Sequence, residues 1–354
     1  MTSPPVLGVF HGKACRLLAM KSRRARALAG EAALQGAVLG LFVNTDIDFE
    51  AGTVRYMRMT PNGWTNWRGP MPDVVLQGEP MRSDEQCPVA ARLRGLVPFV
   101  SWTLPDKSAV SEVLQSTALA PHVVPFRHVV GSDAEAVIAA FLEEHQRAVL
   151  KPGYEHLANR IFFVARDGDE IVVRRRDRRW RLPRDKGLRE LASLIGDKPW
   201  TIQKMIISRV RDGRAFDIFV HAHKGGGGRW ELVRSYGRLS EAGVLATVTH
   251  WGGYLGELDM ALAGLGDDGT ALAAKVRRLG IQIGETLDSQ YGGRLDEIGV
   301  DILVDSQHRP WIAEVNSGPV TRFHEFERAR PHVAHALDIA RRFRDAAATG
   351  SPSE

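Results

Sequence analysis

Two apolar segments near the end of the chain constrain its fold most, because acidic and amide side chains occupy defined places in them. The segments are residues 299–305 (GVDILVD) and 310–315 (PWIAEV), with a short polar stretch between them. This pattern predicts two adjacent antiparallel strands. Residues two apart on a strand share a face, so Glu314 and Asn316 point the same way and pairing brings Asp301 close. Two carboxylates and an amide oxygen around one point suit Mg²⁺ with bound phosphates.

The same acidic residues could instead be solvated charges at the ends of two strands. Apolar side chains flank them, since Ile302 follows Asp301 directly and Ile312 lies two residues before Glu314. Such flanks indicate strands that are buried on at least one face, which favours a built site. The sequence alone leaves both interpretations open.

Two lysines that precede these strands in the sequence could bind the phosphates of a nucleotide. Lys107 begins a helix-like stretch, and Lys151 ends the apolar strand 148–151 (AVLK) just before Pro152. A lysine ammonium neutralises phosphate oxygens without demanding a fixed geometry. Each lysine taken alone is more often an ordinary surface residue. Together with the acidic strands, they mark a candidate site for a nucleotide tail.

The remainder of the chain alternates strands and helices, which predicts an α/β (α+β) fold. A helix over residues 132–146 is expected to begin with a capping box formed by Ser132 and Glu135. A hairpin is predicted from 160–165 and 170–174, joined at a glycine. Further strands are predicted at 6–10, 37–43, 73–77, 200–206, 216–222 and 230–235, and further helices at 22–35, 188–195, from about 270, and at 331–343.

Length and composition narrow the class of protein. A chain of 354 residues suggests two or three packed units. Its formal net charge of +5 suits anionic partners, from nucleotides to nucleic acid. Cys15 and Cys87 cannot build a disulfide framework, so a reducing cytosol is the default compartment. No stretch reaches the roughly 18 apolar residues of a membrane span, and the first residues lack the basic start of a secretory signal. We therefore expect a cytoplasmic protein without membrane contact.

The order of these motifs resembles the ATP-grasp superfamily, and within it the YheC/YheD family known from the endospore coats of bacilli. The resemblance covers nearly the whole length. It is carried by the N-terminal strand–helix–strand unit and by residues 201–230 (TIQKMIISRVRDGRAFDIFVHAHKGGGGRW). It is also carried by 234–240 (RSYGRLS), 249–254 (THWGGY) and the ending Glu-Val-Asn-Ser-x-Pro at 314–319.

The resemblance implies an ATP-grasp fold preceded by an N-terminal α/β pre-grasp domain. The pre-grasp domain would span residues 1–105. The first ATP-grasp subdomain, with the lid, the strand lysine and the adenine hinge, would span 106–205. The second, with the metal site, would span 206–345, and residues 346–354 would form a flexible tail.

The resemblance also implies an activity and a role for each site residue. The protein would use ATP and one or two Mg²⁺ ions to join a small-molecule or peptide carboxylate to an amine or thiol through an acyl-phosphate. Association with the spore coat would also follow. The implied phosphate contacts are Lys107 and Lys151; the adenine hinge is Gln203, Lys204, Met205 and Ile206; the catalytic cations are Lys151 and Arg238; the metal ligands are Asp301, Glu314 and Asn316, with Glu314 bridging.

The chain departs from the family pattern at three places. The loop after Lys151, residues 152–160, keeps only Gly153 where a glycine-rich loop is usual. Phe219 stands where the family has an arginine, and His250 follows Thr249 where an asparagine is usual. These changes motivate an alternative, a non-catalytic or weakly ATP-binding coat-associated protein with a degenerate site.

Residues 174–186 (RRRDRRWRLPRDK) form a strongly basic run around one tryptophan. Arginines interleaved with an aromatic residue could bind nucleic acid through phosphate contacts and stacking. A solvated connection between the hairpin and the next helix is the simplest interpretation of the run. Docking of an anionic substrate or coat partner is a third interpretation. We do not expect nucleic acid as a partner of the chain.

Four histidines in the second half of the chain are candidate metal ligands. His221 and His223 share one face of a predicted strand, but no cysteine or third histidine lies beside them in the sequence. His250 and His324 likewise lack zinc-type spacing. We therefore interpret these histidines as polar strand or loop residues.

Overall fold

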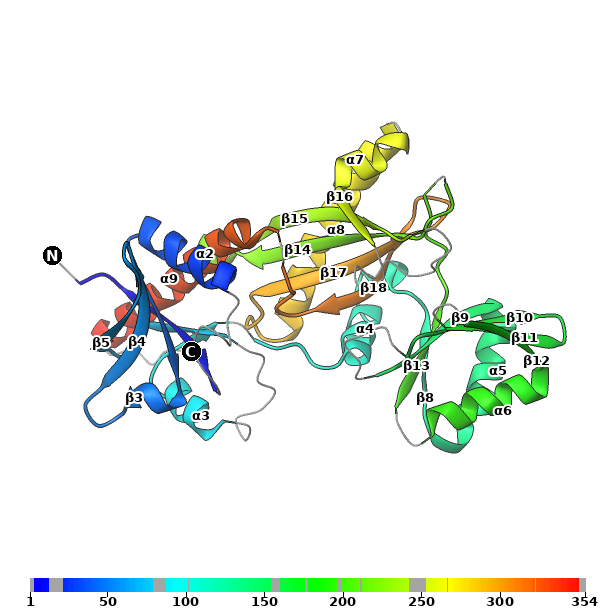
Figure 1. Ribbon diagram of the computed structural model, residues 1–354, viewed down its shortest axis with the longest axis horizontal. Helices are drawn as coiled ribbons and strands as arrows, with labels where there is room; N and C mark the ends of the chain where they lie inside the picture. The colour runs from blue at the N-terminus through cyan, green and yellow to red at the C-terminus, as the bar shows by residue number, and fades with distance from the viewer. Residues whose placement is uncertain are drawn as a thin grey trace.

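The computed structural model describes residues 3–12, 22–78, 87–100, 102–153, 160–175, 178–196, 199–210, 212–241, 253–265, 267–321 and 323–349. Within these residues the strands form three sheets, which follow one another along the longest axis (Figure 1). The fold is a mixed α/β architecture, as expected from the sequence.

The first sheet has the order β3-β4-β2-β1-β6-β7, with β5 paired to β4. Its central strand β1 runs parallel to both β2 and β6. Continuous apolar sequences such as VLGVFH in β1 suit strands covered on both faces. The strands are β1 (Val6–His11), β2 (Val38–Val43), β3 (Ile47–Asp48), β4 (Thr53–Thr60), β5 (Gly63–Pro70), β6 (Val74–Gln77) and β7 (Phe99–Val100); the helices are α2 (Ser22–Leu34) and α3 (Pro88–Arg94).

The second sheet is antiparallel, in the order β12-β11-β10-β9-β13-β8. Two helices pack against it, and they share one core with its strands. The strands are β8 (Phe126–Val129), β9 (Arg147–Pro152), β10 (Phe162–Asp167), β11 (Glu170–Arg175), β12 (Arg178–Pro183) and β13 (Trp200–Lys204); the helices are α5 (Ala134–His145) and α6 (Arg184–Ile195).

Two details of this sheet differ from the sequence-based expectations. The predicted capping box is wrong: α5 has Asp133 at its N-cap without a side-chain cap, and Ser132 Oγ donates to Asp133 Oδ1 instead. A short 3-10 turn, Gly131–Asp133, precedes the helix, so the helix begins later than expected and Ser132 is not at the capping position.

The basic run is also more than a connection, because Arg178–Pro183 forms strand β12.

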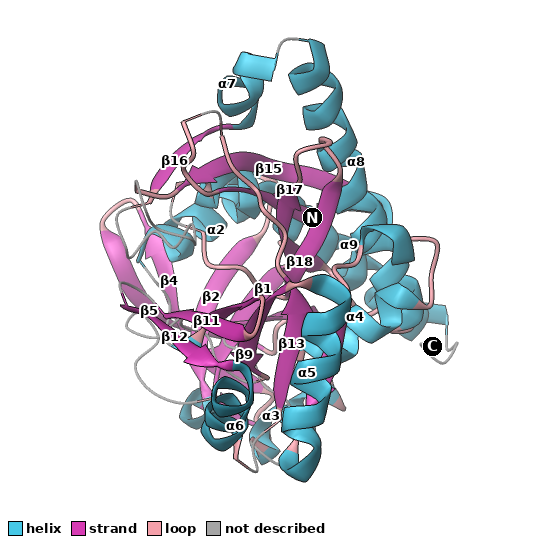
Figure 2. Cartoon of the chain, turned by 90° about the vertical axis from the view of Figure 1, so that its right-hand side faces the viewer, coloured by secondary structure: helices cyan, strands magenta, loops and turns pink. Residues whose placement is uncertain are grey.

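The third sheet lies between the other two and is antiparallel, in the order β16-β15-β14-β17-β18. Figure 2 shows α8 running alongside its strands. Gly280 permits this close packing, because a Cβ there would lie 2.3 Å from a methyl carbon of Val220. The elements are α4 (Lys107–Gln115), β14 (Phe216–Lys224), β15 (Trp230–Leu239), β16 (Tyr254–Glu257), α7 (Leu258–Leu262), α8 (Asp267–Gln290), β17 (Glu297–Val304) and β18 (Pro310–Asn316).

The last helix, α9 (Glu325–Thr349), connects the third sheet back to the first. Its first turns contact β14, while Val333 and Ala336 join the apolar core beneath α2. Figure 1 shows α9 beside α2. The helix begins earlier than predicted, since Pro331, expected at its start, lies inside it.

Short 3-10 turns lie at Asn44–Asp46, Ala120–His122, Gly131–Asp133, Gly226–Gly228 and Ala263–Leu265. Among the helices that the structure describes, none combines the length and the apolar stretch that crossing a bilayer requires.

Candidate active site

The acidic strands meet as their spacing suggested. Asp301 on β17 lies directly opposite Glu314 on β18, and a register shift follows Asp301. The side chain of Asn316 is hydrogen-bonded to Glu314. Two carboxylates and one amide are therefore gathered on two neighbouring strands of the third sheet.

The two lysines reach this point from other elements. Lys107 is the first residue of α4, where Asp106 caps the helix by accepting from the backbone N–H groups of Ser108 and Ala109. Its Nζ lies 2.6 Å from Glu314 Oε1. Lys151, on β9 of the second sheet, interacts electrostatically with Glu314. The site is thus built between the second and third sheets.

The burial of Lys151 affects its pKa. Desolvation lowers the pKa of Lys151, and the neighbouring Lys107 lowers it further, whereas Glu314 and Asp301 act in the opposite direction. The net shift is downward. An anionic ligand here would favour the charged form of Lys151, because opposite charge offsets the cost of burial.

Arg238 on β15 lies between two carboxylates. Its Nε is 2.5 Å from Asp217 Oδ1 and its Nη2 is 2.8 Å from Asp301 Oδ1. Burial acts to lower the pKa of Arg238, but Asp301 and Asp217 outweigh burial and raise it. Arg238 therefore stays cationic and holds Asp301 in place.

The two acidic residues differ in their protonation behaviour. Burial raises the pKa of Asp301 to about 6; Arg238 opposes this shift, and Glu314 and Asp217 add to it. Burial acts in the same direction on Glu314, yet Lys107 and Lys151 bring its pKa below the ordinary value. Asp301 is therefore protonated more readily than Glu314. Carboxylate and amide oxygens suit Mg²⁺, so these residues fit a divalent cation.

A cleft opens beside these charges, between α4 and strands β9 and β13. Its empty volume is about 370 Å³ when the open solvent at its mouth is included. Its polar lining includes Lys107, Ser108, Ser111, Lys151, Thr201 and Gln203. Sequence reasoning missed the hydroxyl groups of Ser108, Ser111 and Thr201; the one available signal was that both serines fall in the helix that Lys107 begins.

One residue of the expected adenine hinge lines the same cleft. Gln203 lines the cleft near the end of β13. The backbone N–H groups of Lys204 and Met205 donate to the carbonyls of Pro125 and Arg147, at 2.8 and 3.1 Å. The Nζ of Lys204 lies 5.7 Å from the ring centroid of Trp311. Two backbone donors of the hinge are therefore engaged within the protein.

Phe219 occupies the position where the resemblance implied an arginine. It is 5% exposed and lies opposite Asp301 in the sheet. The guanidinium carbon of Arg238 stands 5.6 Å from its ring centroid, a cation–π distance. Phe219 thus supports Arg238 with an apolar surface. The other two departures, at residues 154–159 and 249–250, lie outside the described residues.

His221 and His223 lie on strand β14, as expected, but each also contacts a histidine that is distant in the sequence. His221 Nδ1 lies 2.9 Å from His324 Nε2, and His223 is close to His332 on α9. Both strand histidines are fully buried. Spacing could not reveal these neighbours, because more than a hundred residues separate the partners.

The three sheets and the cleft between the second and third define an ATP-grasp protein. Solved structures with this fold include the VanG D-Ala:D-Ser ligase from Enterococcus faecalis, 12% identical with a TM-score of 0.53 over 95% of this chain and 99% of that chain. The D-alanine–D-alanine ligase from Bacillus anthracis, solved with ATP, is 12% identical with a TM-score of 0.52 over 98% of this chain and 99% of that chain.

Comparison of the sequence with known families narrows this class to one family. The family model for YheC/D-like ATP-grasp matches residues 96–341, and the chain belongs to this family. The endospore coat-associated protein YheD of Bacillus subtilis (strain 168) is 23% identical over 290 residues. That match covers 77% of this chain, and the chain spans only 62% of the length of the relative.

Proposed function

We propose that the protein is an ATP- and Mg²⁺-dependent ligase that joins a carboxylate to an amine (or thiol) through an acyl-phosphate. The observation that carries this proposal is that two lysines, from α4 and β9, meet two carboxylates, from β17 and β18, beside one cleft. Lys107 lies 2.6 Å from Glu314, and Lys151 interacts with Glu314 and Asp301 across the sheets. Such a set can balance the charge of a triphosphate and its metal ion.

The chain's own residues have distinct roles in this proposal. Lys107 and Lys151 neutralise the phosphate oxygens, and the hydroxyl groups of Ser108 and Ser111 on α4 line the cleft beside them. Residues 203–206 hold the adenine. Asp301, Glu314 and Asn316 hold Mg²⁺, which, when bound, polarises the phosphoryl oxygens and offsets their charge.

The reaction has two steps. A carboxylate oxygen of the substrate forms a bond to the γ-phosphorus of ATP, and the bond from that phosphorus to the ADP oxygen breaks. The nucleophile then attacks the acyl carbon, phosphate leaves with the bonding electron pair, and the amine or thiol loses a proton. In this proposal Arg238 faces an oxygen of the transferring phosphoryl or acyl-phosphate group, which its contacts with Asp217 and Phe219 support.

A second candidate function is favoured by specific observations. Phe219 replaces the expected arginine, and two hinge N–H groups are already engaged. Both features suit a coat-associated protein that binds ATP weakly and does not turn it over. In either case we propose a cytoplasmic protein that can become spore-associated; a ligase would act on a small-molecule or peptide carboxylate and an amine acceptor.

An ADP-release assay separates the two candidates. The full chain is supplied with Mg-ATP and with pools of carboxylates, amines and peptides, and hydroxylamine is added to trap an acyl-phosphate as a hydroxamate. The ligase proposal predicts ADP and phosphate in equal amounts, hydroxamate formation, and loss of all three in Glu314→Gln. If no acid, amine or peptide raises ADP formation above that of the variant, the ligase proposal is wrong.

A further inference from the structure

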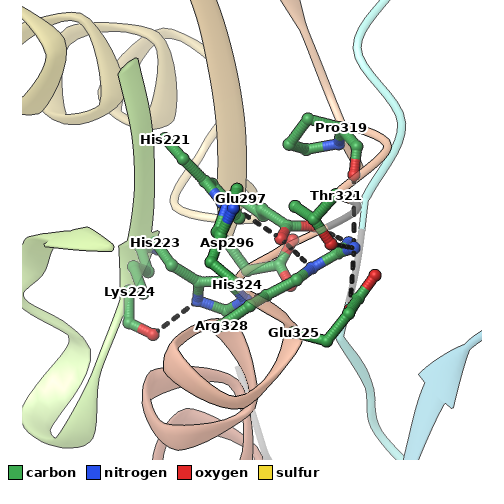
Figure 3. Close-up of polar contacts among 10 residues, drawn as sticks. All are labelled: His221, His223, Lys224, Asp296, Glu297, Pro319, Thr321, His324, Glu325 and Arg328. Atoms are coloured by element: carbon green, nitrogen blue, oxygen red, sulfur yellow. Dashed lines mark hydrogen bonds and ion pairs between the residues drawn. The ribbon is translucent and has the colours of Figure 1, made fainter. Parts of the chain in front are cut away.

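A buried group of nitrogen and oxygen donors lies apart from the cleft, where three segments distant in sequence meet. His223 comes from β14, Asp296 directly precedes β17, and His332 comes from α9. One ligand atom of each lies within 4.8 Å of the other two. The three residues are 0%, 2% and 1% exposed. Figure 3 shows His223 and Asp296 together with the neighbouring charged residues.

The hydrogen bonding of His223 fixes the direction of its lone pair. Its Nδ1 lies 2.7 Å from the carbonyl oxygen of Lys224, so Nδ1 carries the proton and donates it there. Its Nε2 has no hydrogen-bond partner among the described residues, and Asp296 Oδ2 lies 3.9 Å away. Burial lowers the pKa of His223 to about 3, which keeps the ring neutral. A buried lone pair without a donor is costly.

This geometry is the one found at histidines that bind metal ions. In such sites one ring nitrogen donates to a backbone carbonyl or carboxylate, and this bond fixes the tautomer that presents the other nitrogen to the metal. His223 already has this orientation. Asp296 supplies an oxygen and His332 a second imidazole at the same point.

Two nearby cations, Arg328 and Lys224, form ion pairs with carboxylates outside the three proposed ligands. Arg328 forms an ion pair with Glu297, with Nε 2.5 Å from Oε1 and Nη2 2.6 Å from Oε2. The Nζ of Lys224 lies 2.7 Å from Asp288 and 2.8 Å from the carbonyl oxygen of Gly293. Burial, together with Arg328, lowers the pKa of the third cation, Arg24, to about 10. Arg24 also interacts electrostatically with Glu297, Glu325 and Asp296.

We propose that His223, Asp296 and His332 bind one divalent transition-metal ion of the Zn²⁺ type, separately from any nucleotide. Two imidazoles and a carboxylate are donors that zinc accepts, with metal–ligand distances of about 2.0–2.2 Å. Ligand atoms of a tetrahedral zinc site stand about 3.4 Å apart, so binding would bring any wider pair of these donors closer together. The nitrogen donors disfavour Mg²⁺ and Ca²⁺, which prefer all-oxygen sites.

The proposed ion is structural. It would join β14 and the start of β17 to α9, and α9 packs in the core beneath the first sheet. The ion would therefore fix the first sheet against the third. Asp296 also lies on the segment that leads into β17 and Asp301.

The test is a metal titration of the full chain without nucleotide. The chain is stripped with a chelator and titrated separately with Zn²⁺, Co²⁺ and Mg²⁺. We expect one Zn²⁺ per chain, a visible Co²⁺ absorption band that Zn²⁺ abolishes, no saturable response to Mg²⁺, and a rise of about 5 °C in Tm with Zn²⁺. A wild-type chain that binds no stoichiometric Zn²⁺ overturns the proposal, whatever the variants do.

Variants locate the ion. His332→Gln is expected to weaken Zn²⁺ binding at least tenfold, whereas His335→Gln, a buried histidine on the same helix outside the three ligands, retains it. Glu314→Gln is also expected to retain the ion, so the result does not depend on the proposed ligase activity. Unchanged Zn²⁺ binding in a folded His332→Gln chain contradicts this site.

Discussion

The Nζ of Lys107 lies 2.6 Å from Oε1 of Glu314, which joins the start of α4 to the end of β18. A cation proposed to bind phosphate and a carboxylate proposed to bind metal are thus partners in the protein without nucleotide. A Mg²⁺-bound triphosphate would replace this pair with two new ones: Lys107 with phosphate and Glu314 with the metal ion.

Replacing Lys107 tests this exchange. Lys107→Met removes a positive charge from the phosphate end of the cleft, so we expect the affinity for Mg-ATP to fall about tenfold, or about 1.4 kcal/mol. Affinity for adenosine should not change, because adenosine carries no phosphate. Isothermal titration calorimetry measures both. Lys186→Met, at an exposed lysine on α6, is the matched control; equal losses for adenosine and ATP would contradict the assignment.

Arg238 is expected to stabilise the fold as well as the site. Arg238→Met leaves Asp217 and Asp301 without their cation, which should lower the free energy of unfolding by about 2 kcal/mol. Adding Asp217→Asn to this variant should restore part of the loss, since one uncompensated charge disappears. Urea denaturation of the single and double variants measures this, with Arg189→Met at an exposed site as control. A single variant as stable as the wild type would argue against the role.

The buried histidines make stability depend on pH. Burial lowers the pKa of His223 and of His324 to about 3, and that of His335 to about 4. An unfolded histidine titrates near 6.5, so the unfolded chain binds more protons below that pH. Their contribution is complete above about pH 6.5 and is lost at roughly 1.4 kcal/mol per pH unit for each histidine as the pH falls.

Chemical denaturation at several pH values between 7.5 and 5 measures this effect. The charged groups facing these histidines include Glu297, Arg328, Arg234 and Lys224. His324→Gln should reduce the slope of stability against pH in that range. A stability that stays constant from pH 7.5 to 5 would show that these rings are already protonated or exposed.

The basic run should not serve as a nucleic-acid site. Strand β12 is an edge strand, and Arg181 on it pairs with Asp167 and Glu170. Charged side chains on an edge strand also discourage pairing with another sheet. We expect Arg178→Ala combined with Arg179→Ala to leave RNA and DNA affinity unchanged in a filter-binding assay. A loss of tenfold or more would restore the nucleic-acid interpretation.

The sequence predicted those parts of the fold whose signal is local. Continuous apolar runs located β1, β2 and β17, and the two-residue repeat placed Glu314 beside Asn316. Strand β12 was not predicted because it is an edge strand with mostly exposed side chains, so its arginines give no alternation of apolar and polar residues. The start of α9 was predicted too late because proline usually lies in the first turn of a helix, whereas Pro331 lies inside α9.

The site was predictable only where strand pairing decides it. Asp301 and Glu314 meet through the register of adjacent strands, which a short hairpin nearly dictates. The meeting of His223 with His332 depends on the return of α9 across the third sheet, and no spacing rule encodes that path. The hydrogen bonds from the hinge N–H groups to the carbonyls of Pro125 and Arg147 likewise depend on tertiary contacts that the local sequence does not reveal.

The central claim is that Glu314 and its neighbours hold a Mg²⁺-bound nucleotide. The most direct measurement is a calorimetric titration of the full chain with ATP, with and without Mg²⁺, on the wild type, Glu314→Gln and the exposed control Glu50→Gln. The account predicts saturable binding that requires Mg²⁺ in the wild type and in Glu50→Gln, and a loss of at least tenfold in Glu314→Gln. ATP binding that is absent from the wild type, or that persists unchanged in Glu314→Gln, would contradict it.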